Sequence, residues 1–150
     1  MKVINLFDSK NQQYWLTQIK KSDWVAGKYL YEIITNNTFF NEAGIGAKVL
    51  LLTKGKALIS FCTYAQKDNI PNDDLTPWVG FVYTFPKYRG NRYIGLLFDE
   101  VQELAQLSNI KRVYLSTDHV GLYEKYGFNY LMQHIDLDNE LARIYVKEIK

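Results

Sequence analysis

The sequence predicts an α/β sandwich, in which helices cover the faces of a mixed β-sheet. Apolar segments of strand length fill the middle of the chain, between residues 48 and 85. A longer segment with apolar residues at helical spacing follows them, over residues 94–105. The whole order is strand, two helices, a run of strands, helix, strand, helix and two strands. Such an alternation of helices and strands favours a sheet sandwiched between helices.

Length and composition favour one domain over residues 1–150. A chain of 150 residues buries roughly 70% of its unfolded surface, and 47% hydrophobic and 15% aromatic residues can fill that core. The net charge of +2 is too small to indicate a nucleic-acid partner. No apolar run approaches the ~20 residues of a membrane span, and no signal peptide is evident. A single cysteine, Cys62, excludes an intrachain disulfide and a multi-cysteine metal site, and it fits a reducing compartment. We therefore expect a cytoplasmic protein without a metal or a membrane partner.

The N-terminal third predicts one strand and two helices. The first six residues alternate apolar and polar side chains, which is typical of a short strand. Asp8 and Ser9 can cap a helix that extends to about residue 20. Ser22 and Asp23 offer a second cap, for a helix over residues 24–35.

A strong hairpin pattern follows, with Lys54-Gly55 as the tight turn between residues 48–53 and 56–64. Both arms are apolar on both faces, so we expect this hairpin at the centre of the sheet. Residues 67–74 form a polar, acidic loop, and the next strand spans residues 78–85.

The last third predicts a helix, a short strand, a short helix and two closing strands. The helix has one continuous apolar stripe, made by Ile94, Leu97, Phe98, Val101, Leu104 and Ala105. Residues 112–116 are of strand length, and Gly127 stops a short helix over residues 120–126. The closing strands lie on either side of the turn at Asp138-Asn139.

The segment 85–95 is the first candidate for chemistry, because it joins a strand to the start of an amphipathic helix through a glycine-containing turn. Such a turn presents unpaired N–H groups and the positive end of the helix dipole, which favour a phosphate or pyrophosphate. Arg89 and Arg92 would add charged donors. The segment has neither the Gly-Lys-Ser/Thr ending of a nucleotide-triphosphate loop nor a GxGxxG pattern. The alternative is a turn with two arginines in solvent.

A second segment, Leu122-Tyr123-Glu124-Lys125-Tyr126-Gly127-Phe128, changes the interpretation of the first. Pro86, Tyr88, Arg89 and Gly90 followed by this heptapeptide resemble the GNAT superfamily of N-acetyltransferases, over about residues 48–149. The resemblance implies a three-layer α/β/α sandwich around a mixed, largely antiparallel sheet of about seven strands. It also implies direct transfer of an acetyl group from acetyl-coenzyme A (acetyl-CoA) to a primary amine.

The resemblance assigns roles to particular residues. The backbone around Tyr83 and Thr84 would pair with the pantetheine arm and supply an N–H to the oxyanion. Ser116 stands where many members of the family have an asparagine. Tyr123 would be the general acid. Two small residues of the family's pattern fall on Arg92 and Ile94, with Gly95 one position later. The residues expected to bind the coenzyme are Tyr83, Thr84, Arg89, Gly90, Asn91, Arg92, Tyr93, Ile94, Gly95 and Ser116.

The sequence does not identify which residue is the general base. Many relatives use a glutamate near the start of the fourth strand, but Trp78-Val79-Gly80-Phe81 carries no acid. The candidates are His119, Asp73, Asp74, Tyr64 or a water molecule.

The remaining features of the sequence concern the acceptor, the role of Cys62, pairing in a homodimer and the alternative functions. The acidic loop 68–74 favours a cationic acceptor, either a small molecule or a peptide amine. Cys62 could be a nucleophile, but a small core residue fits it better. Edge strands near residues 136–149 could pair in a homodimer. The alternative functions are a non-catalytic acyl-CoA-binding or regulatory module and an unrelated phosphate-binding interaction domain.

Overall fold

The computed structural model describes residues 1–150 as one seven-stranded sheet with helices on both faces. The strands are β1 (Lys2–Asn5), β2 (Lys48–Lys54), β3 (Ala57–Ala65), β4 (Trp78–Thr84), β5 (Arg112–Thr117), β6 (Asn129–Ile135) and β7 (Leu141–Glu148). The α-helices are α1 (Gln12–Lys20), α2 (Val25–Thr35), α3 (Phe39–Ala43) and α4 (Ile94–Leu107). Short 3-10 helices are η1 (Leu6–Asp8), η2 (Pro86–Tyr88) and η3 (Tyr123–Tyr126).

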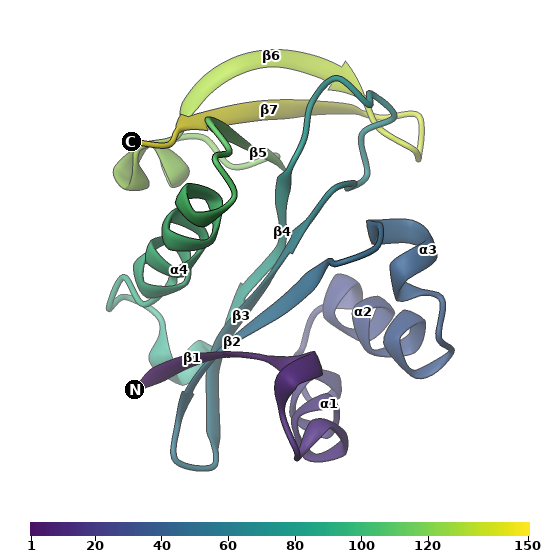
Figure 1. Ribbon diagram of the computed structural model, residues 1–150, viewed down its shortest axis with the longest axis vertical. Helices are drawn as coiled ribbons and strands as arrows, with labels where there is room; N and C mark the ends of the chain where they lie inside the picture. Colours follow the sequence, from purple (N-terminus) through teal and green to yellow (C-terminus); the bar gives the residue numbers. More distant parts are fainter.

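The strand order is β1-β2-β3-β4-β5-β7-β6, and only the pair β4–β5 is parallel. Figure 1 shows α4 on one face of the sheet and α1, α2 and α3 on the other. The predicted three-layer sandwich around a mixed, largely antiparallel sheet is therefore confirmed. No helix is both long and apolar enough to cross a membrane.

The β2–β3 hairpin lies inside the sheet, as its two apolar faces predict. Residues 49–53 and 58–63 are all buried. One set of hairpin side chains packs under α1 and α2, and the other packs under α4. The turn is Gly55-Lys56 rather than Lys54-Gly55, because Lys54 still pairs with Ala57. Gly55 has a φ of 59°, which glycine adopts without strain.

The predicted stripe of α4 faces the sheet. Its buried members are Ile94, Leu97, Phe98, Val101 and Ala105, and they share a core with Cys62 of β3. Cys62 has no exposed surface, so its interpretation as a core residue is confirmed.

The predicted start of the first helix is wrong by a few residues. Leu6 is fully buried and begins η1, and the chain then makes a further turn before α1 begins at Gln12. Ser9 accepts a hydrogen bond from the Asn11 N–H at 3.0 Å, so its hydroxyl serves this turn and not the helix end.

The second predicted cap is also wrong. Trp24 takes the N-cap position of α2 in an extended conformation, and no side chain caps the helix. The ring of Trp24 stacks on Tyr83 of β4 with centroids 5.4 Å apart. The Tyr83 hydroxyl accepts a hydrogen bond from the Asp23 N–H at 3.3 Å. Packing against β4 therefore decides this boundary, and not the capping propensity of Ser22 and Asp23.

The parallel pairing of β4 with β5 is very short. It covers only Trp78 with Tyr114 and Val79 with Leu115. Beyond Val79, β4 stays with β3 up to Thr84, whereas β5 continues beside β7 to Thr117. The two central strands therefore separate after Val79, and an opening forms between them.

The C-terminal end of the sheet has one free edge. β6 is the edge strand, whereas β7 lies between β5 and β6. Of the segment expected to pair in a homodimer, β7 is already paired on both sides. Only β6 is left with an unpaired edge, and the homodimer stays a prediction.

Candidate active site

The loop between β4 and α4 presents five backbone N–H groups that have no acceptor within the chain. Gly90 has a φ of 85°, so it reverses the chain after η2. The N–H groups of Gly95 and Leu96 are already used, because they donate to the carbonyls of Arg92 and Tyr93 at 3.0 Å. The free N–H groups belong to Gly90, Asn91, Arg92, Tyr93 and Ile94. Unpaired donors at the start of a 14-residue helix form a concavity that suits an anion.

Arg92 keeps a backbone conformation that glycine would adopt freely. Its φ is 57°, in the left-handed region, which costs a residue with a Cβ roughly 1–2 kcal/mol. Ile94 is 9% exposed and points into the core beneath α4. At position 92 the backbone therefore takes a conformation that glycine adopts freely, and at position 94 the side chain packs in the core.

Arg89 and Asn91 hold this loop against the end of β4. The Arg89 Nε donates to the Thr84 carbonyl at 2.9 Å, and its guanidinium lies 5.3 Å from the centre of the Tyr83 ring. The Asn91 side-chain amide donates to the carbonyls of Tyr88 and Arg89 at 3.1 and 3.3 Å. The two side chains therefore fix the loop from within, and the exposed Arg89 keeps donors for a ligand.

At the opening, backbone groups near the end of β4 face away from β3. The Phe85 N–H donates to Ile59 of β3 at 3.0 Å, and backbone direction alternates along a strand, so the N–H of Thr84 faces away from β3. The Tyr83 carbonyl, in contrast, accepts a hydrogen bond from the Ser60 hydroxyl at 2.6 Å. Thr84, more than Tyr83, is therefore placed to pair with an extended ligand.

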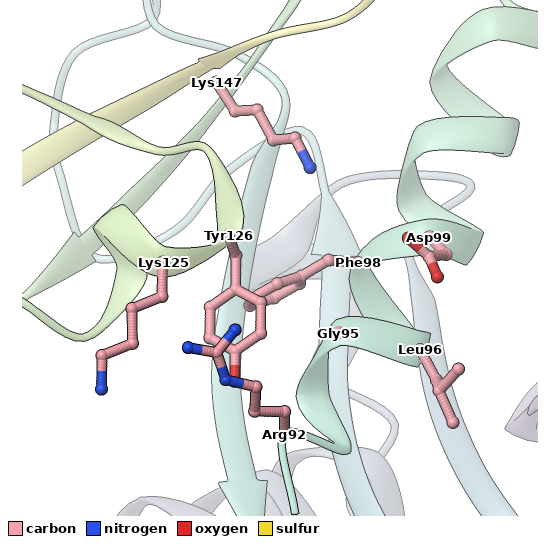
Figure 2. Close-up of a pocket in the computed structure, with 8 residues that line it drawn as sticks. All are labelled: Arg92, Gly95, Leu96, Phe98, Asp99, Lys125, Tyr126 and Lys147. Carbon is pink, nitrogen blue, oxygen red and sulfur yellow. The ribbon is translucent and has the colours of Figure 1, made fainter.

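A pocket of about 420 Å³ lies between the start of α4 and the segment that carries η3 (Figure 2). Arg92, Lys125 and Lys147 reach it from three separate segments, and Asp99 supplies one opposing charge. Burial lowers the pKa of Lys147. A Cβ atom on Gly95 would lie 3.3 Å from the Tyr126 ring, so the glycine lets this ring pack against α4. The pocket is therefore a cationic extension of the N–H concavity, walled by an aromatic ring.

Tyr123 lies on the α4 side of the sheet and is almost buried. Its ring contacts Phe98 and Phe128 with centroids 6.1 and 6.3 Å away. Gly127, at a φ of 88°, ends η3 and turns the chain into β6, which holds the tyrosine in place. Burial, with smaller contributions from Cys62 and Tyr126, raises the pKa of Tyr123 to about 12. The phenol is therefore protonated throughout the neutral range.

The other predicted residues take different positions. His119 is exposed, with its ring centroid 6.4 Å from that of Tyr123. Ser116 is half-buried in β5, opposite Ile144 of β7. Tyr64 is half-buried toward α4, and burial raises its pKa. Asp73 and Asp74 are exposed on the β3–β4 loop.

Asp68 was not among the predicted site residues. Its carboxylate is half-buried and lies against Gly80 of β4, just beyond the last residue that pairs with β5. Burial raises the pKa of Asp68 from 3.8 to about 6, and the Asn69 N–H offsets part of this rise. The sequence signal that could have found it is an acidic residue ahead of a strand that has glycine at the position next to the opening.

The model of the acetyltransferase (GNAT) family matches residues 11–128. No curated protein matches the sequence.

Several solved structures share the fold. One is an acetyltransferase of the GNAT family from Staphylococcus aureus Mu50, with 17% identity, 99% of each chain covered and a TM-score of 0.65. A second is an acetyltransferase from Streptococcus agalactiae 2603, with 22% identity, 98% of this chain and 97% of that chain covered, and a TM-score of 0.67. A third is an aminoglycoside 6'-N-acetyltransferase complexed with coenzyme A, with 12% identity, 100% and 98% covered, and a TM-score of 0.69. With the family match over most of its length, the chain belongs to the GNAT family of acetyltransferases.

Proposed function

We propose that the protein transfers an acetyl group from acetyl-CoA to a primary amine, by direct attack of the amine on the thioester. The observation that carries the proposal is the continuity of three features. The five free N–H groups before α4, the outward backbone of Thr84 and the opening between β4 and β5 form one path through the sheet. An extended ligand with a pyrophosphate at one end and a thioester at the other matches this path.

The residues present fit coenzyme A. The five N–H groups and the α4 dipole suit the pyrophosphate, and Arg89 and Arg92 would add charge there. Lys125 and Lys147 would serve a further phosphate in the pocket of Figure 2. The Thr84 N–H would bind the amide-rich arm or the thioester oxygen. The coenzyme supplies an activated acetyl group; no group of three or more potential metal-ligating side chains is present.

Tyr123 would act on the leaving sulfur. With a pKa of about 12, its phenol is a weaker acid than a typical thiol, whose pKa is roughly 8.5, so complete proton transfer to the thiolate is unfavourable. The physical role that this supports is a hydrogen bond to the sulfur as negative charge develops on it. We therefore propose that Tyr123 serves the leaving sulfur as a hydrogen-bond donor, with the final proton coming from solvent.

The opposite side of the opening suits the acceptor. Trp24 and Phe81 are half-buried there, with ring centroids 6.4 Å apart, and the exposed Asp73 and Asp74 lie on the neighbouring loop. Aromatic faces and carboxylates both attract a cation. We therefore propose a cationic amine, a class that includes aminoglycosides, on which a protein of similar fold acts.

The proposal is tested by incubating the protein with acetyl-CoA and a panel of polyamines, aminoglycosides, amino acids and peptide N-termini, while measuring free thiol release. We expect amine-dependent release with at least one cationic class. Binding of coenzyme A in calorimetry without release for any amine would instead favour the non-catalytic acyl-CoA-binding module. Absence of coenzyme A binding would favour the unrelated phosphate-binding domain.

Replacing Arg92 with glycine tests two properties of this residue by two measurements. Its strained backbone conformation affects stability, and its charge affects coenzyme A binding. Arg92→Gly should raise the free energy of unfolding by about 1 kcal/mol, since glycine adopts a φ of 57° without strain. The same change should weaken coenzyme A binding roughly fivefold to tenfold, because one charge-assisted contact is lost. Chemical denaturation and calorimetry measure the two effects. Lys10→Ala, which removes an exposed charge elsewhere, is the control, and equal coenzyme affinity in both variants would contradict the contact.

Replacing Tyr123 with phenylalanine tests its contact with the sulfur. Tyr123→Phe should lower kcat roughly 10- to 100-fold and leave the coenzyme A dissociation constant within about twofold, because the lost hydrogen bond forms only as charge develops. Steady-state kinetics and calorimetry are the measurements. Tyr130→Phe, which removes an exposed hydroxyl on β6, is the matched control. Full turnover by Tyr123→Phe would show that the role is misassigned.

The contribution of the acidic loop to binding the acceptor can be tested separately from the acetyl-transfer step. The double change Asp73→Asn with Asp74→Asn should raise KM for a cationic amine roughly threefold to tenfold and leave kcat nearly unchanged, because exposed carboxylates contribute modest, screened attraction. The effect should shrink as salt is added. An unchanged KM across all active amines, at low salt, would remove these residues from the acceptor site.

A further inference from the structure

We infer that Asp68 is the general base that takes the proton from the acceptor amine, so that the β3–β4 loop supplies the carboxylate that β4 lacks. This inference rests on the proposed function and adds a catalytic residue to it. It depends on three observations: the space made by Gly80, the face of the sheet on which the carboxylate lies, and the lack of an ion-pair partner.

Gly80 is where the carboxylate meets β4. Its backbone φ is not in the left-handed region, so its conformation does not require glycine. The space beside the strand at position 80, however, does require glycine. A Cβ atom on Gly80 would overlap with Oδ1 of Asp68, and it would lie 3.2 Å from the Asp68 Cγ and 3.1 Å from the Thr63 hydroxyl. The absence of a side chain at position 80 therefore lets the Asp68 carboxylate lie directly against the strand, at the opening between β4 and β5.

The carboxylate lies on the face of the sheet opposite Tyr123. Cys62 and Tyr64, on either side of Thr63, pack on the α4 side together with Tyr123. Side chains alternate along a strand, so Thr63 and the position opposite it, Gly80, face the other way. Figure 1 shows the β3–β4 loop on the side of the sheet away from α4, and Asn69 of this loop accepts a hydrogen bond from the Leu137 N–H at 2.8 Å.

This arrangement suits acyl transfer, because the attacking nitrogen and the leaving sulfur lie on different sides of the thioester carbon. The acceptor enters as an ammonium ion and gives one proton to the Asp68 carboxylate, which makes the nitrogen a nucleophile. The neutral nitrogen then forms its bond to the thioester carbon, and its second proton passes to solvent. The carbon–sulfur bond breaks and its electron pair leaves on the sulfur, beside the Tyr123 hydroxyl. The protonated Asp68 then returns its proton to solvent. A base on one face and a hydrogen-bond donor on the other therefore divide the reaction between the two layers of helices.

Asp68 has no structural ion-pair role. The chain contains one salt bridge, between Arg112 and Glu148, and no charged group contributes to the environment of Asp68. Burial alone raises its pKa, to about 6, which makes it a stronger base than an exposed aspartate and leaves it ionised at neutral pH. A half-buried carboxylate without a cation destabilises the fold, which is typical of a functional position.

The test compares Asp68→Asn with the unmodified protein, using an amine that the protein acetylates. Asp68→Asn should lower kcat/KM roughly 100-fold or more at pH 7, with an unchanged dissociation constant for coenzyme A. In the unmodified protein kcat/KM should fall as the pH drops through about 6, because Asp68 becomes protonated. Asp68→Asn should lack this limb of the pH profile. The difference between the two proteins should narrow above pH 9, where solvent deprotonates the amine. Glu103→Gln, on the exposed side of α4, removes the same charge and should change nothing.

Gly80→Ala gives an independent measurement. The added methyl group should push the carboxylate away from β4 and lower kcat, while coenzyme A binding is retained. In the Asp68→Asn background the same change should have little further effect on kcat, because both changes remove one interaction. Additive effects of the two substitutions would mean that Gly80 does not act through Asp68, and would overturn this part of the inference.

Thermal unfolding shows whether Asp68→Asn is folded. The pKa of Asp68 is higher in the folded chain than in the unfolded chain, so its protonated form favours folding. The stability that it contributes is fully present below about pH 4 and is lost as the pH rises through about 6. Asp68→Asn should therefore melt at a similar temperature near pH 4 and at a higher temperature than the unmodified protein above pH 7.

These measurements distinguish failure of the proposed function from failure of Asp68 as its base. Absence of thiol release from the unmodified protein with every amine would overturn the proposed function, and the base with it. Release by the unmodified protein and equal release by Asp68→Asn, with the limb near pH 6 retained, would overturn the base alone. A large loss in Asp68→Asn that narrows above pH 9 supports both.

Discussion

The separation of β4 from β5 is the constraint on which the rest of the structure depends. Two residue pairs join these strands, and beyond them the centre of the sheet is open. Unpaired backbone groups inside a sheet are unfavourable unless something satisfies them, so the opening needs a ligand or water. The loop before α4, the segment around Tyr123 and the β3–β4 loop are all arranged around this one opening. The sheet is therefore best understood as two smaller sheets, joined by Trp78 and Val79.

The opening is maintained from both sides by packing. Trp78 is buried against Tyr114, Ala142 and Ile144, which fixes the start of β4 to the half of the sheet that contains β5. The other end of β4 is fixed to the helical layer, where Tyr83 lies between Trp24 and the guanidinium of Arg89. Between these anchors Phe81 has a φ of 49° and interrupts the register with β3. This irregularity lets β4 follow β3 away from β5, and it brings Gly80 to the point of separation.

Most of the fold could be predicted from the sequence, because its strongest signals are local. The apolar hairpin, the stripe of α4 and the stop at Gly127 all depend on residues close together in the chain. The misassigned caps at Ser9 and Ser22 fail because Leu6 and Trp24 pack against distant strands, which overrides capping propensity. The motif around Tyr123 could be identified from its spacing. Asp68 could not, since its significance depends on contact with Gly80, twelve positions away along an irregular loop.

The burial of Cys62 bears on the free thiol that the proposed function would release at every turnover. Under the proposed function, product coenzyme A leaves a site close to this cysteine, because the cysteine contributes to the environment of Tyr123. An accessible thiolate there would be open to mixed-disulfide formation with oxidised coenzyme. Cys62 has no exposed surface, and burial raises its pKa to about 12, so the reactive thiolate does not form. The lone cysteine of the chain is thereby protected from covalent capture by oxidised forms of its own product.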